Sequence, residues 1–347
     1  MLQSLKFAKA KMNERFPVPD EIALRILSYL SQKDLARLSQ VNRYFRRIST
    51  DDNFWTCITM DAMEILFHDE SVRMLFRRCS KLKSVVIEDE DCIGITFQIF
   101  NILAEAKCSL KNIQMAPTLM VWSQTDMEAL GQMKELKCLQ LTISNVEQSQ
   151  VLENIKYLTG LEILVMRLWR FSAVSPENIQ SVNEVFGALK NLRYIDFAPI
   201  VDATLSCLVS NNNKLQTIHL HRREITDESL EQIVQTCPDL EVLHIRNNSR
   251  ALEILCNCVN LRILYLFGNN LCEEEVLTKL VETNTRLERF VMDGGESALV
   301  TEKGIQNMCA KAKALKAFTF RHFAAQVGDG AGARIRKKFP GVEIKII

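Results

Sequence analysis

The sequence predicts an α/β fold in which short parallel strands alternate with helices along the chain, preceded by a bundle of three short helices. Three observations predict it. A segment of the form Leu-x-x-Leu-x-Leu recurs along most of the 347 residues, segments with helical spacing separate its copies, and the residues before the first copies follow only the helical pattern. A chain of this length exceeds the usual size of one compact core, so a stack of repeated units is the expected architecture.

The repeating unit is clearest in residues 215–245. This stretch begins with LQTIHL, and LEVLHI follows 25 residues later. Each copy directs three apolar side chains to one side of a short extended segment. Between the copies, Thr226 and Asp227 are placed to cap a helix whose apolar residues follow helical spacing. One strand and one helix therefore form the unit.

Further copies complete a long array. They begin at Leu82, Leu110, Leu136, Leu161, Leu192, Leu261, Leu287 and Leu315, with a degenerate last copy near Val342. Parallel strands at ~4.8 Å spacing with wider helices behind them must curve, so about eleven strands should form a horseshoe with a concave strand side. The 21-residue step from Leu240 to Leu261 leaves little room for a helix, whereas the 31-residue step from Leu161 adds a loop at 169–175.

Several helices between the strands have readable starts. Ser175 precedes a proline at a first-turn position, and Thr301 and Asp202 occupy similar places. Thr125 and Glu128 have the spacing of a capping box. We expect a helix to begin at each of these sites.

Residues 16–58 predict the three-helix bundle, and residues 1–15 are a lead-in with no specific pattern. Asp20 follows Pro19 and is expected to act as an N-cap for a helix with Ile22 and Ile26 on its apolar face. Two further short runs end near Trp55, where the strand pattern begins. A bundle this small buries little surface, so it should lean on the following domain or on a partner.

This segment resembles an F-box. The resemblance rests on Pro-Asp-Glu at 19–21, Ile-Leu-x-x-Leu at 26–30, Lys-Asp-Leu at 33–35, then Val41, Phe45 and Trp55, with departures at Val18, Asn42 and Phe45. Residues 59–347 resemble leucine-rich repeats, because most copies of the leucine motif start about 25 to 28 residues apart. Cys79, Cys237 and Cys258 each precede a repeat leucine by three positions, which resembles the cysteine-containing subclass found in F-box proteins. The simpler alternative is a helical cap that only shields the first repeat.

The resemblance implies a non-catalytic substrate-recognition subunit of an SCF ubiquitin ligase. The F-box would dock on a Skp-type adaptor, and through it on the cullin-RING core, while the repeats bind a target protein. An interaction scaffold that binds the adaptor without a cullin is the main alternative. The residues expected to contact the adaptor are Pro19, Asp20, Glu21, Ile22, Ile26, Leu27, Leu30, Leu35, Val41 and Phe45.

The concave strand positions and the 169–175 loop supply the candidate target-binding residues. They are Arg167, Trp169, Arg170, His219, His221, His244, Arg246, Tyr265, Phe267 and Arg321. Arginines beside aromatic rings suit an acidic or phosphorylated segment with an apolar side chain. Three alternatives remain: an ordinary solvated face, a pocket for a small anionic cofactor, and a zinc site built from the three histidines.

Composition excludes several other classes of protein. The 43 basic and 42 acidic residues argue against wholesale binding to nucleic acid or membrane. Enzymatic activity has little support, because no Walker loop, Gly-x-Ser-x-Gly or His-Glu-x-x-His motif is present and the glycines at 328–332 lack the context of a phosphate loop. We expect no cofactor and no metal, because no carboxylate or cysteine near the three histidines is an obvious fourth zinc ligand. No apolar run matches a membrane span or signal peptide, and eleven cysteines at apolar positions indicate a reducing cytoplasmic or nuclear compartment.

Overall fold

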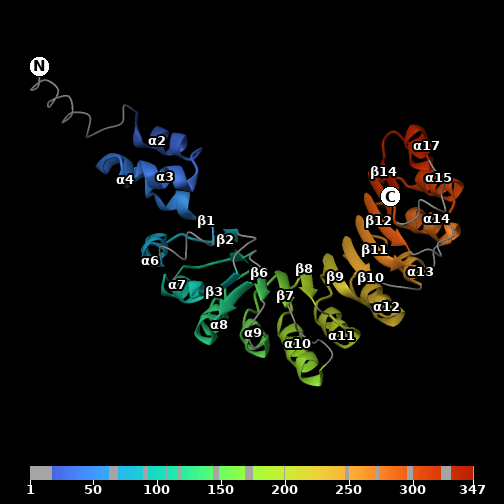
Figure 1. The fold of residues 1–347 in the computed structure, drawn as a ribbon, viewed down its shortest axis with the longest axis horizontal. Coiled ribbons are helices and arrows are strands. Elements are labelled where there is room, and N and C mark those ends of the chain that lie inside the picture. The colour runs from blue at the N-terminus through green and yellow to red at the C-terminus, as the bar shows by residue number, and fades with distance from the viewer. Residues whose placement is uncertain are drawn as a thin grey trace, which may run out of the picture. The chain divides into compact units, whose positions relative to one another are not determined.

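The structure is a computed structural model that describes residues 18–61, 69–88, 93–106, 108–115, 119–143, 148–168, 175–198, 200–246, 250–269, 273–294, 300–321 and 330–346. The chain divides into two compact units, Met1–Leu136 and Lys137–Ile347. In each unit parallel strands alternate with helices, as the repeat pattern predicts (Figure 1). Among the described residues, no helix has the length and apolarity needed to cross a membrane.

The first unit begins with a helical bundle and continues into three parallel strands. The bundle comprises α2 (Asp20–Leu27), α3 (Gln32–Leu38), α4 (Arg43–Ser49) and the 3-10 turn η1 (Asp52–Trp55). The repeats of this unit comprise β1 (Cys57–Asp61), α6 (Asp69–Arg78), β2 (Ser84–Glu88), α7 (Ile99–Glu105), β4 (Asn112–Met115) and α8 (Gln124–Gly131). Strand β1 pairs with β2, and β2 with β4. The predicted division between residues 58 and 59 falls inside β1.

A second, two-stranded parallel sheet in this unit was not predicted. It joins β3 (Ile93–Phe97) to β5 (Leu119–Trp122), each of which precedes a helix. The ring of Trp122 stacks on Phe100 at the start of α7, with ring centroids 4.8 Å apart. The apolar runs in these two segments favour strands, but the six-residue leucine motif does not include them.

The second unit contains nine parallel strands. They are β6 (Cys138–Ile143), β7 (Ile163–Leu168), β8 (Tyr194–Ala198), β9 (Thr217–Glu224), β10 (Val242–Arg246), β11 (Ile263–Asn269), β12 (Arg289–Gly294), β13 (Ala317–Arg321) and β14 (Glu343–Ile346). Each strand pairs with the next one in chain order. The register keeps equivalent positions of the repeat side by side, so that Asp196 lies opposite His219 and His244 lies opposite Tyr265. The predicted parallel strands are therefore confirmed, three in the first unit and nine in the second.

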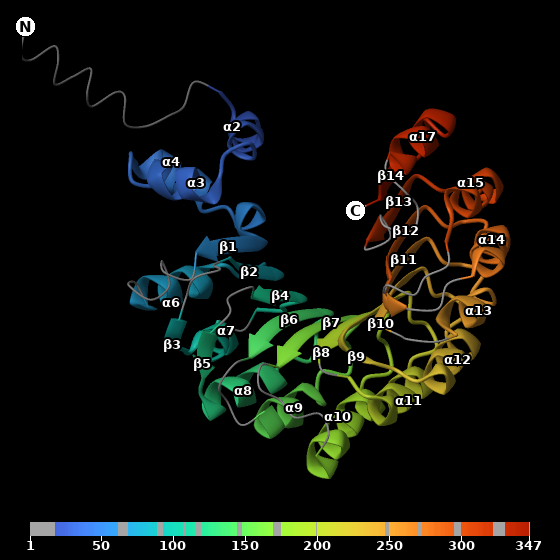
Figure 2. The same ribbon diagram turned by 45° about the vertical axis from the view of Figure 1, so that its right-hand side comes forward.

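Helices cover the outer side of the second unit (Figure 2). They are α9 (Gln148–Ile155), α10 (Pro176–Ala188), α11 (Asp202–Asn211), α12 (Asp227–Thr236), α13 (Ala251–Leu255), α14 (Glu274–Thr283), α15 (Glu302–Lys311) and α17 (Ala331–Lys338). The short step after Leu240 leaves only the five residues of α13, as its length predicts. Because the strands line the inner side of this arc, the polar strand positions form one continuous concave face.

The core of the second unit is a stack of repeat leucines, and beside it several repeats bury a cysteine or an asparagine side chain. Cys237 and Cys258 are buried three positions before the repeat leucine, and Asn212 and Asn284 occupy the same place in other repeats. Each asparagine amide donates to helix carbonyls, and Asn284 also reaches Leu255 O at 3.1 Å in the preceding repeat. The Asn212 oxygen also accepts a hydrogen bond of 3.0 Å from Leu192 N, so this buried amide is satisfied at both ends, whereas Asn284 Oδ1 has no partner among the described residues.

Three of the helix starts predicted between the strands are confirmed, and two differ from the prediction. The side chains of Ser175, Thr226 and Thr301 each accept a hydrogen bond from a backbone amide three residues on, as predicted. The capping box at Thr125 was wrong, because Ser123 is the N-cap of α8. Asp202 is the first residue of α11 and accepts from Thr226 N at 3.0 Å, so it supports the start of the neighbouring helix.

Candidate functional site

Helix α2 and the turns after α2 and α3 present apolar side chains that their own bundle does not cover. Ile22 and Ile26 are each 47% exposed, Leu30 is 40% exposed and Tyr29 is 82% exposed. Val41, after α3, is 64% exposed. These five residues, the apolar patch, are most of the nine large hydrophobic side chains that are exposed among the described residues. An exposed apolar cluster of this kind indicates a site of contact with another protein.

The predicted adaptor residues divide by burial. Pro19, Asp20 and Glu21 are exposed beside the apolar patch, whereas Leu27 and Leu35 are buried in the bundle and Phe45 is half-buried. The buried side chains hold the helices together, so their effect on any partner would be indirect. The direct contact surface is therefore narrower than the sequence predicts.

Asp20 stabilises the bundle in a different way from the one predicted. The N-cap of α2 is Pro19 and makes no side-chain cap. The Asp20 carboxylate instead accepts a hydrogen bond of 3.1 Å from the Tyr44 hydroxyl and pairs with Arg47 at 2.8 Å, which joins α2 to α4. Because Pro19 occupies the N-cap position, the Asp20 carboxylate does not cap α2 and instead contacts residues that are distant in the sequence.

The side chain of Gln32 connects the bundle to the first strand, and that of Trp55 holds the last turn of the bundle to α4. The Gln32 amide donates to the carbonyl of Cys57 and its oxygen accepts from Thr59 N at 3.3 Å. The Trp55 indole donates to Ser49 O at 2.8 Å from a buried position. Bundle and strand are thus joined by side-chain hydrogen bonds without an intervening linker.

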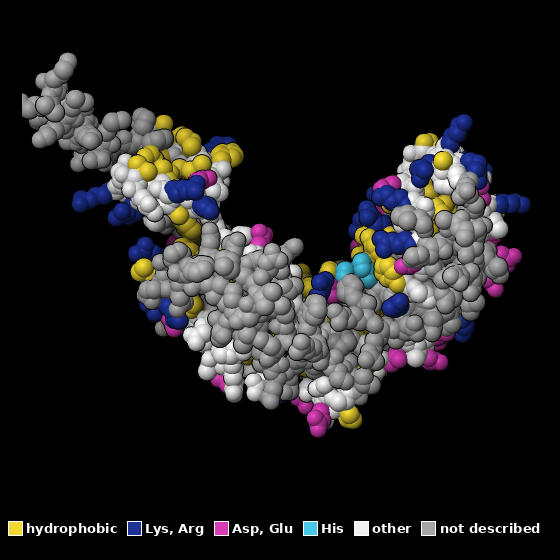
Figure 3. All heavy atoms as spheres, viewed as in Figure 1, with side chains coloured by type: hydrophobic (Ala, Val, Ile, Leu, Met, Phe, Trp, Pro, Cys, Tyr) yellow, Lys and Arg dark blue, Asp and Glu magenta, His cyan; other side chains and the backbone are white. Residues whose placement is uncertain are grey.

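The concave face of the second unit carries a row of four flat rings. Tyr194, His219, His244 and Tyr265 lie on β8 to β11, and we call them the aromatic row. His219 and His244 stack with centroids 3.9 Å apart and 10° between their planes, and His244 lies 3.9 Å from Tyr265. Tyr194 covers the other side of His219 at 5.2 Å. In Figure 3 histidine side chains lie beside hydrophobic and basic ones in the hollow of this unit.

A buried carboxylate lies beside the aromatic row. Asp196 is 4% exposed, and its Oδ2 lies 3.4 Å from the guanidinium of Arg167 and 3.9 Å from Nδ1 of His219. Burial, with the negative charge of Asp196 nearby, raises the pKa of the Tyr194 hydroxyl. Arg167 is thus already paired within the fold, so this predicted anion-binding residue is partly neutralised.

Arg246 and Arg321 lie in one register position of the sheet, separated by Phe267 and Asp293. Both arginines are exposed, whereas Phe267 and Asp293 are half-buried. Neither arginine makes an ion pair with another described side chain. These two cations are free to meet an anionic group of a partner.

Some predicted residues lie outside the described part of the chain. Trp169 and Arg170 are among them, and the side chain of His221 is not described although its backbone belongs to β9. Among the described residues no group of three His, Cys, Asp or Glu side chains is arranged to hold a metal ion. The candidate site therefore consists of the apolar patch on the helical bundle and the concave face of the second unit.

Comparison with known proteins places both surfaces in recognised sequence families. Residues 18–61 match the F-box-like family, and residues 156–322 match the LRR repeats of FBD-associated F-box proteins. The chain is an F-box-like domain followed by leucine-rich repeats. The apolar patch thus lies in the F-box-like domain, and the aromatic row lies in the repeats.

Two solved structures share similarity with the chain, and the first of them supports the fold. The chain is similar to one in the crystal structure of the Rad7 and Elc1 complex in yeast, with a TM-score of 0.60 and 13% identity over 99% of this chain and 94% of that one. The leucine-rich-repeat ectodomain of the Arabidopsis receptor kinase HAESA, in complex with an IDA peptide hormone, has a TM-score of 0.41 and 15% identity over 67% of this chain and 37% of that one. No curated protein sequence matches the chain.

The structure adds three residues that the predicted sites omit. Tyr29 belongs to the apolar patch of the F-box-like domain, Tyr194 belongs to the aromatic row, and Asp196 lies beside that row. Tyr194 lies two residues before Asp196 on the same strand, so both side chains point to the concave face. The period of two within each strand could have identified Tyr194 from the sequence.

Proposed function

We propose that this protein is a substrate-recognition subunit of an SCF-type ubiquitin ligase. The F-box-like domain binds a Skp-type adaptor, and the leucine-rich repeats bind a target protein. The chain itself performs no chemistry. Its contribution is to raise the effective concentration of the target near the ubiquitin-charged enzyme that the other subunits bring.

The apolar patch is the observation that carries this proposal. Its side chains remain exposed on a small helical bundle, while Gln32 of the same bundle bonds to the first strand. The F-box-like match over the same residues, 18–61, supports a Skp-type adaptor as the partner. The complex of Rad7 with Elc1 is an example of a protein of similar fold that binds a second protein.

The concave face supports the second half of the proposal. It combines stacked rings with unpaired arginines, and such rings and arginines are enriched where binding energy concentrates in protein interfaces. Few side chains on this face need to reorganise, because the rings are already packed against one another. A preorganised face of this kind suits a protein segment as ligand.

The adaptor half is tested with paired substitutions. Ile26→Asp with Leu30→Asp places charges in the apolar patch at positions that are 47% and 40% exposed, so the bundle should stay folded. We expect adaptor affinity to fall at least about tenfold, since two desolvated contacts are replaced by buried charges. Binding is measured by isothermal calorimetry, and folding by circular dichroism.

Val259→Asp is the matched control, because Val259 is a 56% exposed apolar residue of the second unit. It should leave adaptor affinity unchanged. If the Ile26 and Leu30 double variant binds the adaptor as tightly as the unmodified chain, the F-box-like domain does not use this surface and the proposal is wrong.

A scaffold that binds the adaptor without a cullin is the second candidate function. The apolar patch is compatible with both, because it accounts only for the adaptor contact. Reconstitution with purified adaptor, cullin and RING protein separates them. A stable four-protein complex on size exclusion supports the ligase subunit, whereas an adaptor complex that excludes the cullin supports the scaffold.

A further inference from the structure

The proposed function does not say which kind of target segment the concave face binds. The charged residues on β10 to β13 indicate the answer. Arg246 and Arg321 occupy the same register position three strands apart. At ~4.8 Å per strand, their attachment points are separated by roughly 14 Å along the sheet. An extended peptide rises about 3.3 Å per residue, so four residues span the same distance.

The two strands between the arginines lack positive charge at this position. Phe267 is half-buried on β11, and Asp293 is half-buried on β12. A carboxylate or phosphate lying over Asp293 would meet a like charge, which is unfavourable in a partly desolvated interface. The face therefore favours anionic groups at the two ends and an uncharged residue between them.

The aromatic row supplies the contact for that uncharged residue. His244 and Tyr265 lie two residues before Arg246 and Phe267 on the same strands, roughly 7 Å away along the strand direction. The ring of Tyr265 is 3.9 Å from His244 and 6.4 Å from Phe267. Together these rings present a flat surface on which an apolar or aromatic side chain can stack.

The other half of the concave face is a poorer site for anions. Arg167 pairs with Asp196 at 3.4 Å. The positions in register with Asp196 carry the neutral residues Val165 on β7 and Gln140 on β6. The distribution of charged side chains therefore favours β10 to β13 as the region that binds anions. A nucleic-acid strand fits this region less well, because its closely spaced phosphates would meet Asp293.

We propose that β10 to β13 bind an extended acidic peptide segment whose two anionic side chains are four residues apart, with an apolar side chain between them. Each anionic group pairs with one of the two arginines, and the apolar side chain packs on His244, Tyr265 and Phe267. This inference rests on the proposed function only in taking a protein segment as the ligand. It requires neither the adaptor nor a cullin.

The test selects peptides from a random twelve-residue display library on the full chain, with counter-selection on the Arg246→Ala, Arg321→Ala double variant. We expect enrichment of Asp or Glu at positions i and i+4 with an apolar residue between. Selected peptides without such a pair, or peptides that bind the double variant equally well, would overturn the inference.

A selected peptide then gives the quantitative test by fluorescence anisotropy. Moving the acidic residues to adjacent positions should weaken binding roughly tenfold, as should Arg246→Ala or Arg321→Ala alone. Arg286→Ala is the control, since Arg286 is an exposed arginine in the turn before β12 and bonds to Asn260. Unchanged affinity in both arginine variants contradicts the inference, as does displacement of the peptide by single-stranded oligouridine at lower concentration.

Two further measurements separate related outcomes. Phosphoserine at both acidic positions distinguishes phosphate from carboxylate as the preferred anion, and preference for either supports the inference because both are anions at the same spacing. Adaptor affinity is measured on the same arginine variants and should not change. If the unmodified chain binds the adaptor but shows no preference for peptides with the spaced acidic pair, this inference is wrong while the proposed function stands.

Discussion

The carboxylate of Asp126, buried near the start of α8, accepts a hydrogen bond of 2.9 Å from the backbone amide of Asn101 at the start of α7. Helix α7 has no side-chain cap of its own, since its N-cap residue Gln98 makes none. The carboxylate of one repeat thus caps the helix of its neighbour. Its second oxygen, Oδ2, has no hydrogen-bond partner among the described residues.

This arrangement predicts a pH-dependent stability. Burial raises the pKa of Asp126 from 3.8 to about 7, against the opposing effect of the backbone hydrogen bonds. The native state therefore holds a proton that the unfolded chain releases, and the stabilisation is complete below pH ~3.8 and lost as the pH rises to about 7. Relative to Asp126→Asn, the free energy of unfolding should fall by roughly 3 kcal/mol between pH 5 and pH 8.

Urea unfolding at several pH values measures this difference. Asp126→Asn keeps a carbonyl oxygen for the Asn101 amide and removes the titration. Asp239→Asn, which replaces an exposed carboxylate, is the control and should follow the unmodified chain. Parallel curves for the unmodified chain and Asp126→Asn would show that Asp126 is ionised in the folded protein throughout this range.

A second prediction concerns the start of α4. Asn42 has an extended backbone, and its side-chain oxygen accepts a hydrogen bond of 2.8 Å from Phe45 N. Asn42→Ala should lower the stability of the bundle by about 1 kcal/mol through loss of this cap, whereas Asn42→Ser should retain most of it. Thermal unfolding of the three proteins tests the ranking. Equal stability of the Ala and Ser variants would mean that the cap contributes nothing.

Asn42 also illustrates what the sequence could and could not predict. Asn42 departs from the usual F-box pattern, yet in the structure its side chain caps the start of α4. The repeat strands were predictable because three buried apolar positions recur in each. The β3 and β5 sheet was not, because nothing repeats in its two segments.

The sequence predicts which side chains face the concave side, but it does not predict which of them form ion pairs. Strand alternation directed His219, His244 and Arg246 to the concave face, and they lie there. It gave no information on which charges pair, so the contact of Arg167 with Asp196 was missed. Ion pairs between long side chains depend on rotamers, which a repeat pattern does not specify.

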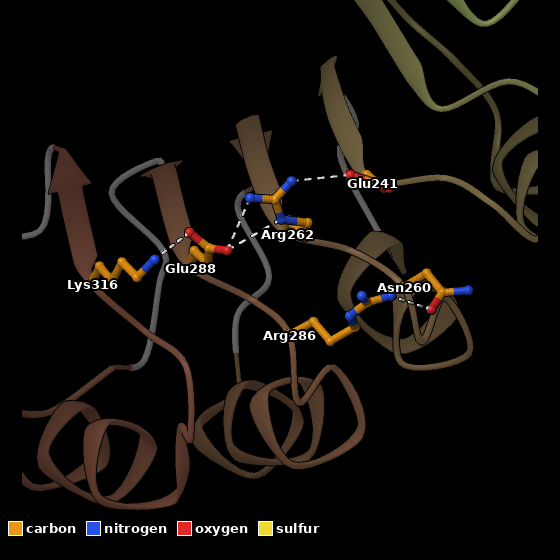
Figure 4. A network of polar contacts seen from close by, with 6 residues as sticks. All are labelled: Glu241, Asn260, Arg262, Arg286, Glu288 and Lys316. Carbon is orange, nitrogen blue, oxygen red and sulfur yellow. Dashed lines mark hydrogen bonds and ion pairs between the residues drawn. The ribbon is translucent and has the colours of Figure 1, made fainter.

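A third prediction compares two residues of one repeat. Arg262 pairs with Glu241 at 3.2 Å and with Glu288 at 3.0 Å, and Glu288 also pairs with Lys316 (Figure 4). These charges alternate where the strands begin, but they are exposed to solvent and screened by salt. Leu264 on β11, two residues after Arg262, is fully buried. Leu264→Ala should therefore cost about 2–5 kcal/mol of stability, and Arg262→Ala much less.

The dependence of stability on salt concentration distinguishes the loss of ion pairs in Arg262→Ala from the loss of core packing in Leu264→Ala. The loss caused by Arg262→Ala should shrink further in 1 M sodium chloride, because the ion pairs of the unmodified chain are then weakened, whereas the loss caused by Leu264→Ala should persist. Chemical denaturation with urea, which adds no charge, is the suitable measurement. An arginine variant as unstable as the leucine variant would show that the charged row determines stability.

The last prediction concerns thiol reactivity. Burial raises the pKa of the Cys79, Cys237 and Cys258 thiols to about 12, whereas Cys57 is exposed at the start of β1. Only the thiolate reacts with an alkylating reagent, so the three buried thiols lack both charge and access at pH 8. Iodoacetamide should modify Cys57 well before these three, as followed by peptide mass spectrometry over time. In urea all four should react at similar rates, and early modification of Cys237 or Cys258 without urea would show that the repeats open locally.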